Sequence, residues 1–250
     1  MKMKISEDFY SVQGEGISQG VPSYFVRLQG CNLICGGPCG RLKDEGKATW
    51  YCDTEPVWRQ GMEVSNEELV GKIQDTGQFE NVLSGDTHIV WTGGEPTLPK
   101  HQKDIVGFLD HLHQKDWKIK PYSEIETNGT QILDSDLLKS VQQLNVSPKL
   151  ANSGMKGSLR IVPEAINSAL QHENSWFKFV VTDESDIEEF ERYFTIPYEI
   201  PRNRVIIMPG CDNLDGLPVA TRKCYELSMK HGYRTISRGH ILAWNKKTGI

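Results

Sequence analysis

Short runs of β-branched and aromatic residues alternate with amphipathic segments along most of the chain, and this alternation most constrains its fold. Strands are predicted at 24–30, 88–93, 122–129, 145–150, 176–181, 204–210 and 233–237. Helices are predicted around the capping-box pair Ser65 and Glu68 and at 105–112, 137–144, 166–170, 187–190 and 219–230. Repeated βα units have right-handed crossovers, so the strands should be parallel and curl into an α/β partial, open, TIM-like barrel.

Length and charge indicate how many domains the chain forms and which class of partner it lacks. The 250 residues contain no Pro/Gly/Ser-rich linker, so we expect a single domain over 1–250. The net charge of -5 and the lack of a dense Lys/Arg run argue against a nucleic-acid partner. The N-terminus does not resemble a signal peptide, and no apolar run is long enough to cross a bilayer. We therefore expect a cytoplasmic protein with no membrane partner.

Unusual polar stretches follow four of the predicted strands. They are the cysteine loop that begins at residue 31, "TGGEP" (92–96), "ETNGT" (126–130) and "PGCD" (209–212). The carboxyl ends of parallel strands lie at one edge of a sheet or barrel, where active sites of such folds are built. These four loops are therefore predicted to form one site.

Four of the six cysteines, Cys31, Cys35, Cys39 and Cys52, lie in one loop. Four thiols can hold a zinc ion, form disulfides, or supply three ligands to an iron-sulfur cluster and leave one spare. Disulfides are rare in the cytoplasm, and structural zinc sites usually present two close pairs of ligands, which this spacing matches poorly. A cluster that keeps one iron open for a substrate needs only three thiolates.

The motifs "GCNLIC", "YC" and "TGGEP" resemble the radical S-adenosylmethionine (SAM) superfamily. Within it, "FYSVQGEG", "FVRLQGCNL", "CDT", "TGGEP", "ETNGT", "VSPK" and "RGH", in order from residue 9 to 240, resemble the 7-carboxy-7-deazaguanine synthase family. The resemblance implies a radical SAM carbon-nitrogen lyase. Such an enzyme converts 6-carboxy-5,6,7,8-tetrahydropterin to 7-carboxy-7-deazaguanine with loss of ammonia, in the 7-deazapurine and queuosine pathway.

The resemblance further implies a 4Fe-4S cluster in the loop 31–54, held by Cys31, Cys35 and Cys52. Cys52 is favoured as the third ligand because an aromatic residue precedes it, as in the superfamily motif, whereas Pro38 precedes Cys39. Cys39 is then the spare thiol, and sixteen residues, 36–51, are inserted between the second and third ligands. A long-insertion variant of the family has a cysteine at position 49, where this chain has threonine.

The SAM-binding residues implied by the resemblance are Tyr51, Cys52, Asp53, Gly93, Gly94, Glu95, Glu126, Asn128, Ser147, Pro148, Lys149, Met208, Pro209, Gly210 and Cys211. Tyr51 would lie against adenine. The two glycines would let the backbone approach SAM, and Glu95 would either accept from the SAM ammonium or secure its loop.

The implied substrate-binding residues are Val12, Gln13, Gly14, Glu15, Arg27, Thr92 and His240. Arg27 suits the substrate carboxylate because its guanidinium can bind both oxygens. Thr54 would ligate Mg2+ beside the substrate. No catalytic side chain is implied beyond the cluster and SAM. Ten residues follow His240, so the family role of the chain end is not carried over to Ile250.

The implied partners are the pterin substrate, a reducing donor such as flavodoxin or ferredoxin, and a second copy of the chain in a homodimer. Two alternatives are a radical SAM activase that makes a glycyl radical on a partner protein, and a zinc-stabilised binding module without enzymatic activity.

Overall fold

The computed structural model describes residues 2–113 and 121–250. Its strands are β1 (Lys2–Val12), β2 (Pro22–Leu28), β3 (Met62–Ser65), β4 (His88–Gly93), β5 (Ser123–Thr127), β6 (Gln143–Val146), β7 (Ser175–Val181), β8 (Val205–Pro209) and β9 (Arg234–Thr235). Its helices are α1 (Arg41–Asp44), α2 (Glu55–Trp58), α3 (Asn66–Asp75), α4 (Phe79–Ser84), α5 (Pro99–His113), α6 (Ser135–Ser140), α7 (Gly157–Arg160), α8 (Pro163–Leu170), α9 (Glu184–Phe190), α10 (Leu217–His231) and α11 (Gly239–Trp244).

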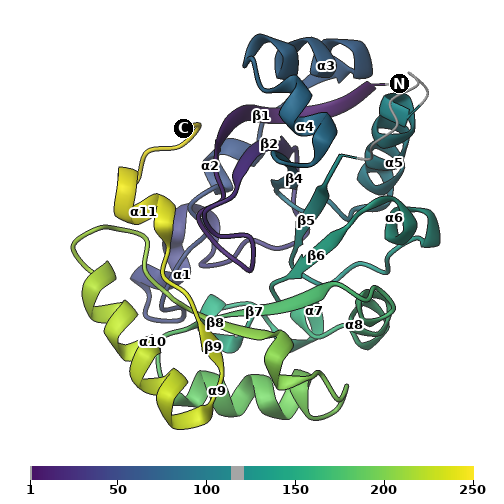
Figure 1. The fold of residues 1–250 in the computed structure, drawn as a ribbon. Helices are drawn as coiled ribbons and strands as arrows, with labels where there is room; N and C mark the ends of the chain where they lie inside the picture. Colours follow the sequence, from purple (N-terminus) through teal and green to yellow (C-terminus); the bar gives the residue numbers. More distant parts are fainter. Residues whose placement is uncertain (1, 114–120) are drawn as a thin grey trace.

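The strands form one curved sheet in the order β3-β1-β2-β4-β5-β6-β7-β8-β9 (Figure 1). From β2 to β9 every neighbouring pair is parallel, which confirms the prediction of an α/β partial barrel. In the part of the chain that the structure describes, the edge strands β3 and β9 do not pair, so the barrel is open. Two strands that were not predicted, β1 and β3, extend the sheet at one edge, where β1 runs antiparallel to both β2 and β3.

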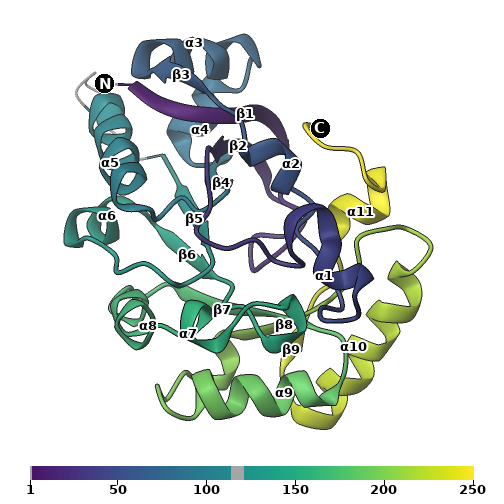
Figure 2. The ribbon, with the colours of Figure 1, turned by 180° about the vertical axis from the view of Figure 1, so that it is seen from behind.

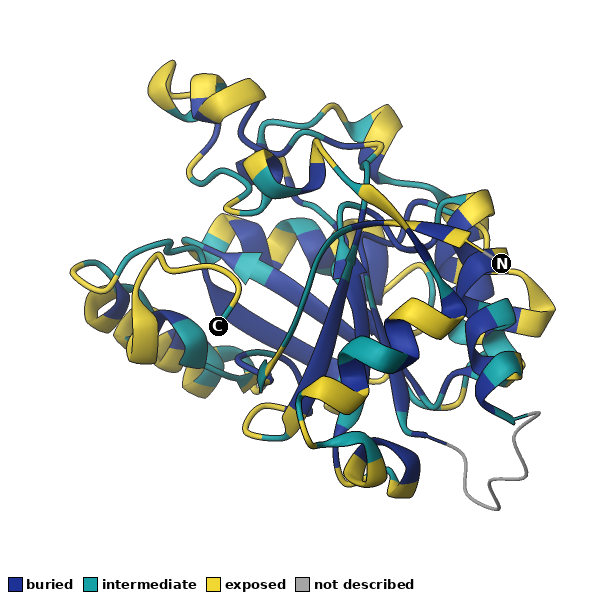
Figure 3. Cartoon of the chain, turned by 90° about the horizontal axis from the view of Figure 1, so that it is seen from above, coloured by how far each residue is buried: buried dark blue, intermediate teal, exposed yellow. Residues whose placement is uncertain are grey.

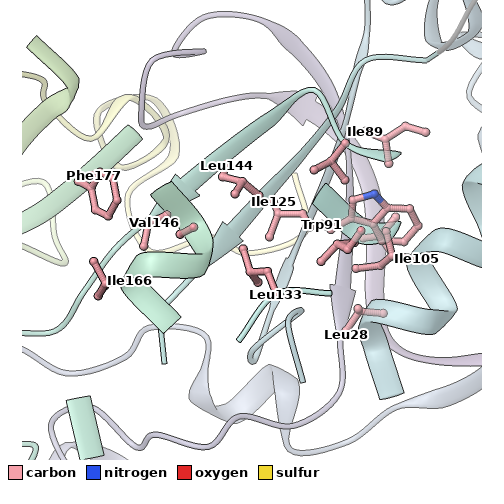
Figure 4. Close-up of a cluster of buried hydrophobic side chains, with 14 of the residues drawn as sticks. Leu28, Ile89, Trp91, Ile105, Ile125, Leu133, Leu144, Val146, Ile166 and Phe177 are labelled. Carbon is pink, nitrogen blue, oxygen red and sulfur yellow. The ribbon is translucent and has the colours of Figure 1, made fainter. Parts of the chain in front are cut away.

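The two faces of the central strands differ in chemistry, because successive side chains of a strand point to opposite faces. One face carries Trp91, Ile125, Leu144 and Phe177, which pack with helix residues such as Ile105 of α5 (Figure 4). Helices that include α5, α8, α9 and α10 cover this apolar face with their buried residues, and the exposed parts of the helices lie on the outside of the molecule (Figure 3). The other face carries charged and amide side chains, among them Glu124, Glu126, Asn145 and Lys178, all on β5, β6 or β7.

Most predicted elements are present, with corrections at a few ends. The capping box is confirmed, because the Glu68 N–H donates to Ser65 Oγ at 3.2 Å and the Ser65 N–H donates to the Glu68 carboxylate at 2.6 Å. The helix predicted over 137–144 ends instead at Ser140: Val141 is extended, and Leu144 lies on β6. That strand begins at Gln143, two residues before the predicted start, and ends before Pro148, so 147–150 is not strand.

Candidate active site

A cavity of about 490 Å³ lies on the polar side of the sheet. It is lined by the ends of the strands, by the loops that follow β1, β2, β4, β5, β6 and β8, and by residues 244–250. Figure 2 shows α1, α2 and α11 near one another beside the inner side of the sheet. Of the site residues predicted from sequence, all of which the structure describes, only Pro148 does not line this cavity. The predicted convergence of separate loops on one site is therefore observed.

Three of the four clustered cysteines face the cavity. Cys31, Cys35 and Cys52 line it, and the N–H of Cys52 donates to the carbonyl of Cys35 at 3.0 Å, which joins the two ends of the insertion. Cys39 is exposed and does not line the cavity. This division matches the choice of Cys52 over Cys39 as the third thiol of the site.

Two of the cavity thiols, those of Cys31 and Cys35, are held in surroundings that disfavour a free thiolate. Burial, followed by the nearby Glu95 carboxylate, raises the pKa of the Cys31 thiol to about 12. Burial also raises the pKa of the Cys35 thiol to about 11. A positively charged metal centre would stabilise these thiolates. Within residues 2–113 and 121–250, no three His, Cys, Asp or Glu side chains converge as ligands of a single metal ion would.

The two glycines of the "TGGEP" loop lie at positions where no other residue fits without a clash or backbone strain. Gly93 has a φ of +110°, and a Cβ placed on Gly94 would lie 1.7 Å from the carbonyl oxygen of Gly30. Glu95 is buried, and its carboxylate accepts hydrogen bonds from both the N–H and the hydroxyl of Thr97, from the Thr127 hydroxyl and from the Asn128 N–H. Of its two predicted roles, these contacts fit the one in which Glu95 secures the loop.

Polar side chains from "ETNGT" and "VSPK" approach the cysteines. Asn128 Nδ2 lies 3.9 Å from Cys31 Sγ, and Lys149 Nζ donates to Ser147 Oγ at 3.0 Å. The same ammonium lies 5.8 Å from the ring centroid of Trp50. Trp50 also lines the cavity and was not predicted as a site residue.

Glu126, which was predicted as a SAM-binding residue, joins two predicted substrate residues. Its carboxylate accepts from the Thr92 hydroxyl at 2.9 Å and from Gln13 Nε2 at 3.1 Å. His240 packs against Gly14 so closely that a Cβ on this glycine would lie 2.4 Å from His240 Nδ1. Burial lowers the pKa of His240 despite the nearby Glu15 carboxylate, which favours a neutral imidazole.

Arg27 points into the cavity with spare hydrogen-bonding capacity. Its Nε lies 2.8 Å from a carboxylate oxygen of Glu7, but the two atoms are not directed as a hydrogen bond, and neither has another hydrogen-bond partner within the protein. The guanidinium also lies 5.4 Å from the centroid of the Phe9 ring. The terminal guanidinium nitrogens of Arg27 make no hydrogen bond to the residues that the structure describes, so they can donate to a ligand carboxylate.

A second group of polar residues is buried on the same face of the sheet. Glu124 has no exposed surface, and its carboxylate accepts from Ser18, Gln143 and Asn145 at 2.6–3.1 Å. Its other oxygen lies 2.9 Å from His88 Nδ1. The segment after β1, which carries Ser18, is thereby fixed to the central strands.

Comparisons with known proteins show the family to which the chain belongs. No family model matches the sequence. The 7-carboxy-7-deazaguanine synthase of Pyrobaculum aerophilum is 34% identical over 252 residues, with 99% of this chain and 97% of that protein covered. The chain belongs to the 7-carboxy-7-deazaguanine synthase family. Its members are radical SAM lyases, and this decides against the glycyl-radical activase and the zinc-stabilised binding module.

Solved structures agree with this membership. The crystal structure of QueE from Escherichia coli matches with a TM-score of 0.65 and 25% identity, and the match covers 96% of this chain and 95% of that one. A structure of anSMEcpe with bound AdoMet and Cp18Cys peptide shares the fold, with a TM-score of 0.53 and 18% identity over 84% of this chain and 60% of that one.

This synthase-family chain places two cations in its cavity that were not predicted as site residues. Lys178 on β7 lies 2.5 Å from one oxygen of Glu15, and Nε of Arg238 lies 2.8 Å from the other. Both cations line the cavity. Lys178 could have been found from its place inside the apolar run "WFKFVV", where an inward charge needs a partner, and Arg238 from the motif "RGH".

The part of the chain that the structure describes contains no helix that is long and apolar enough to span a membrane.

Proposed function

We propose that this chain converts 6-carboxy-5,6,7,8-tetrahydropterin to 7-carboxy-7-deazaguanine, with loss of ammonia, in the cavity described above. The observation that carries the proposal is that three cysteine thiols line the same cavity as Gln13 and Arg27. A cofactor with thiolate ligands and a polar, carboxylated substrate would therefore share one enclosed space. Family membership over nearly the whole chain supports the same reaction.

The residues fit a 4Fe-4S cluster on Cys31, Cys35 and Cys52. All three thiols line the cavity, and the two with raised pKa values would be stabilised as thiolates by a cationic cluster. When bound, the cluster and SAM supply a 5'-deoxyadenosyl radical, which forms by one-electron cleavage of a carbon-sulfur bond of SAM. The protein's share is to hold the reacting groups close together and away from water.

The SAM side of the cavity is formed by residues between the cysteines and the end of β8. The backbone of the "TGGEP" loop, with glycine at 93 and 94, would admit the methionyl group of SAM. Asn128 and Lys149 would bind its polar groups, because they line the cavity beside Cys31 and Ser147. The segment 208–211 and Tyr51 would enclose adenine, and Trp50 lies near this segment, 3.7 Å from a Cβ placed on Gly210.

The pterin would bind on the opposite side. Arg27 would hold the substrate carboxylate with its terminal guanidinium nitrogens, and Gln13 and Thr92, both bonded to Glu126, would face the heterocycle. Thr54 would ligate Mg2+, because its hydroxyl makes only long contacts, 3.4 Å to Cys52 Sγ and 3.5 Å to the carbonyl of Gly93. A reducing donor such as flavodoxin or ferredoxin, a homodimer and a cytoplasmic location stay predictions.

The test is anaerobic incubation of the reconstituted protein with dithionite, SAM, MgCl2 and the carboxylated tetrahydropterin, followed by mass spectrometry. We expect both 5'-deoxyadenosine and 7-carboxy-7-deazaguanine, and neither product from the matched variant Cys52→Ala. Formation of 5'-deoxyadenosine without the deazapurine would reject the proposed substrate. A second arm with EDTA and then added Mg2+, in wild type and Thr54→Val, tests the metal: the wild-type rate should recover with Mg2+, and the variant rate should not.

A further inference from the structure

Four charged side chains from separate parts of the chain form a network beside the cavity, and three of the four are largely buried. Glu15 follows β1, Lys178 lies on β7, and Arg238 precedes α11. Their side chains are only 13%, 7% and 14% exposed. Asp53, between Cys52 and Thr54, completes the network. All four residues line the cavity.

Arg238 uses each of its three guanidinium nitrogens for a different segment. Nε donates to Glu15 at 2.8 Å, one terminal nitrogen donates to Asp53 at 2.9 Å, and the other donates to the carbonyl of Cys211 at 2.6 Å. The three acceptors belong to the substrate segment after β1, to the block that carries the third cysteine, and to the loop after β8. These three segments are far apart in sequence, so their relative placement depends on such contacts.

The backbone around Arg238 is itself fixed to the substrate segment. The N–H of Gly239 donates to the carbonyl of Gly14 at 2.9 Å, and Gln19 donates both to that carbonyl and to the carbonyl of Ser237. The base of the Arg238 side chain is therefore held at the substrate segment, and its tip reaches Asp53 and Cys211. Because a planar guanidinium has donors in fixed directions, it sets the geometry between these groups, which a single ammonium cannot do.

We propose that Arg238 is a positioning residue that holds the substrate segment (12–15) in register with the cluster-ligand block (52–54). The proposal rests on the proposed function, because it concerns the distance between the pterin and the group that removes its hydrogen. Arg238 does not need to touch either reactant. Its loss would let the substrate segment move relative to the SAM side, so that radical formation continues without productive hydrogen transfer.

The experiment measures the ratio of 5'-deoxyadenosine to 7-carboxy-7-deazaguanine under anaerobic turnover for wild type, Arg238→Met and Arg238→Lys. Misplacement of reacting groups by about 1 Å lowers rates by roughly 10²-fold, so deazapurine formation should fall by about that factor in Arg238→Met. Formation of 5'-deoxyadenosine should fall much less, and the ratio should rise about tenfold or more. Arg238→Lys should also be uncoupled, because its single nitrogen cannot reach all three acceptors that the guanidinium meets with three separate nitrogens.

The matched control is Arg234→Met, which removes an exposed arginine that stacks on Trp176 outside the cavity. It should keep the wild-type ratio. An unchanged ratio in Arg238→Met, or a wild-type ratio in Arg238→Lys, would overturn the proposal. If the wild type itself makes no deazapurine, the proposed function fails instead, so the two failures are distinguishable.

A second variant guards against loss of folding in Arg238→Met. Asp53→Ala removes one acceptor of the network and leaves the Glu15 contacts in place. Uncoupling in the same direction, together with faster amide exchange over 12–15 and 52–54 in the protein without SAM, supports the proposal. A wild-type ratio and wild-type exchange in Asp53→Ala would reject it.

Discussion

Gly94→Ala should destabilise the protein strongly, because the new methyl group has no space. A Cβ at Gly94 would lie 1.7 Å from the carbonyl oxygen of Gly30, 2.3 Å from its carbonyl carbon and 3.0 Å from the nitrogen of Cys31. All three are backbone atoms, so no side-chain rotation relieves the clash. The "TGGEP" loop and the segment that carries Cys31 would have to move apart.

The size of the effect follows from what this movement breaks. The N–H of Gly94 donates to Leu28 at 3.0 Å, and the N–H of Glu95 donates to Gly30 at 2.8 Å. Two backbone hydrogen bonds contribute about 0.5–1.5 kcal/mol each, and overpacking costs about 1–3 kcal/mol. The free energy of unfolding should therefore fall by about 2–6 kcal/mol. Gly71→Ala is the matched control: Gly71 lies inside α3 with nothing within 4 Å of its Cβ position, and alanine there should stabilise by about 0.4–1 kcal/mol.

The assay is urea unfolding of the protein without cluster, followed by circular dichroism, with iron content measured separately after reconstitution. Gly94→Ala should lower the urea midpoint and bind less iron, because the displaced segment contains Cys31. Gly71→Ala should do neither. A Gly94→Ala midpoint equal to that of wild type would refute the close-packing argument.

Three further predictions concern single side chains. Cys39→Ser should keep wild-type iron and visible absorbance while Cys52→Ser loses both; the reverse pattern would move the third ligand to Cys39. Burial alone would raise the pKa of Glu15, but its two cationic partners hold that pKa well below its usual range. Glu15→Gln should therefore lower the free energy of unfolding by about 3–5 kcal/mol at pH 7. This difference from wild type should shrink as the pH falls below about 4.5 through the folded pKa, and a difference independent of pH would contradict this. Glu124→Gln should lower the free energy of unfolding by about 3 kcal/mol, because several buried donors lose a charged acceptor. An unchanged melting temperature would count against this prediction.

Local patterns were enough to predict the central strands but not the antiparallel edge. The run 88–93 became β4 with the predicted bounds, because its composition favours a buried strand on its own. β1 mixes charged and apolar residues, and most of them are exposed or partly exposed. Its sequence therefore lacks the pattern of a buried strand. Its pairing with β3 depends on contacts between residues about sixty positions apart, such as Lys2 with Ser65. α6 ends earlier than predicted for a similar reason. Leu144, which the apolar pattern assigned to this helix, instead pairs with Ile125 in the sheet.

The same distinction holds for the site. Residues in short motifs, such as Gly94 and Cys52, could be predicted because their chemistry is local to the motif. The network of Glu15, Lys178 and Arg238 could not be predicted, because Lys178 and Arg238 lie 163 and 223 positions after Glu15 in the sequence. A lysine inside an apolar run indicates only that a partner exists, and the fold decides which carboxylate it is.

The insertion 36–51 explains how a chain with unusual cysteine spacing can still present three thiols to one cavity. The insertion is not a free loop: the N–H of Gly36 donates to Ser153 at 2.8 Å, and the N–H of Thr49 donates to Asn152 at 2.8 Å. The indole of Trp50, two positions before the third cysteine, donates to the Asn152 side chain at 2.9 Å. Because the entropy of closing a loop grows only slowly with its length, anchoring both ends to 152–153 makes sixteen extra residues tolerable. The position of Cys52 is therefore set by these anchors and not by the number of residues that separate it from Cys35.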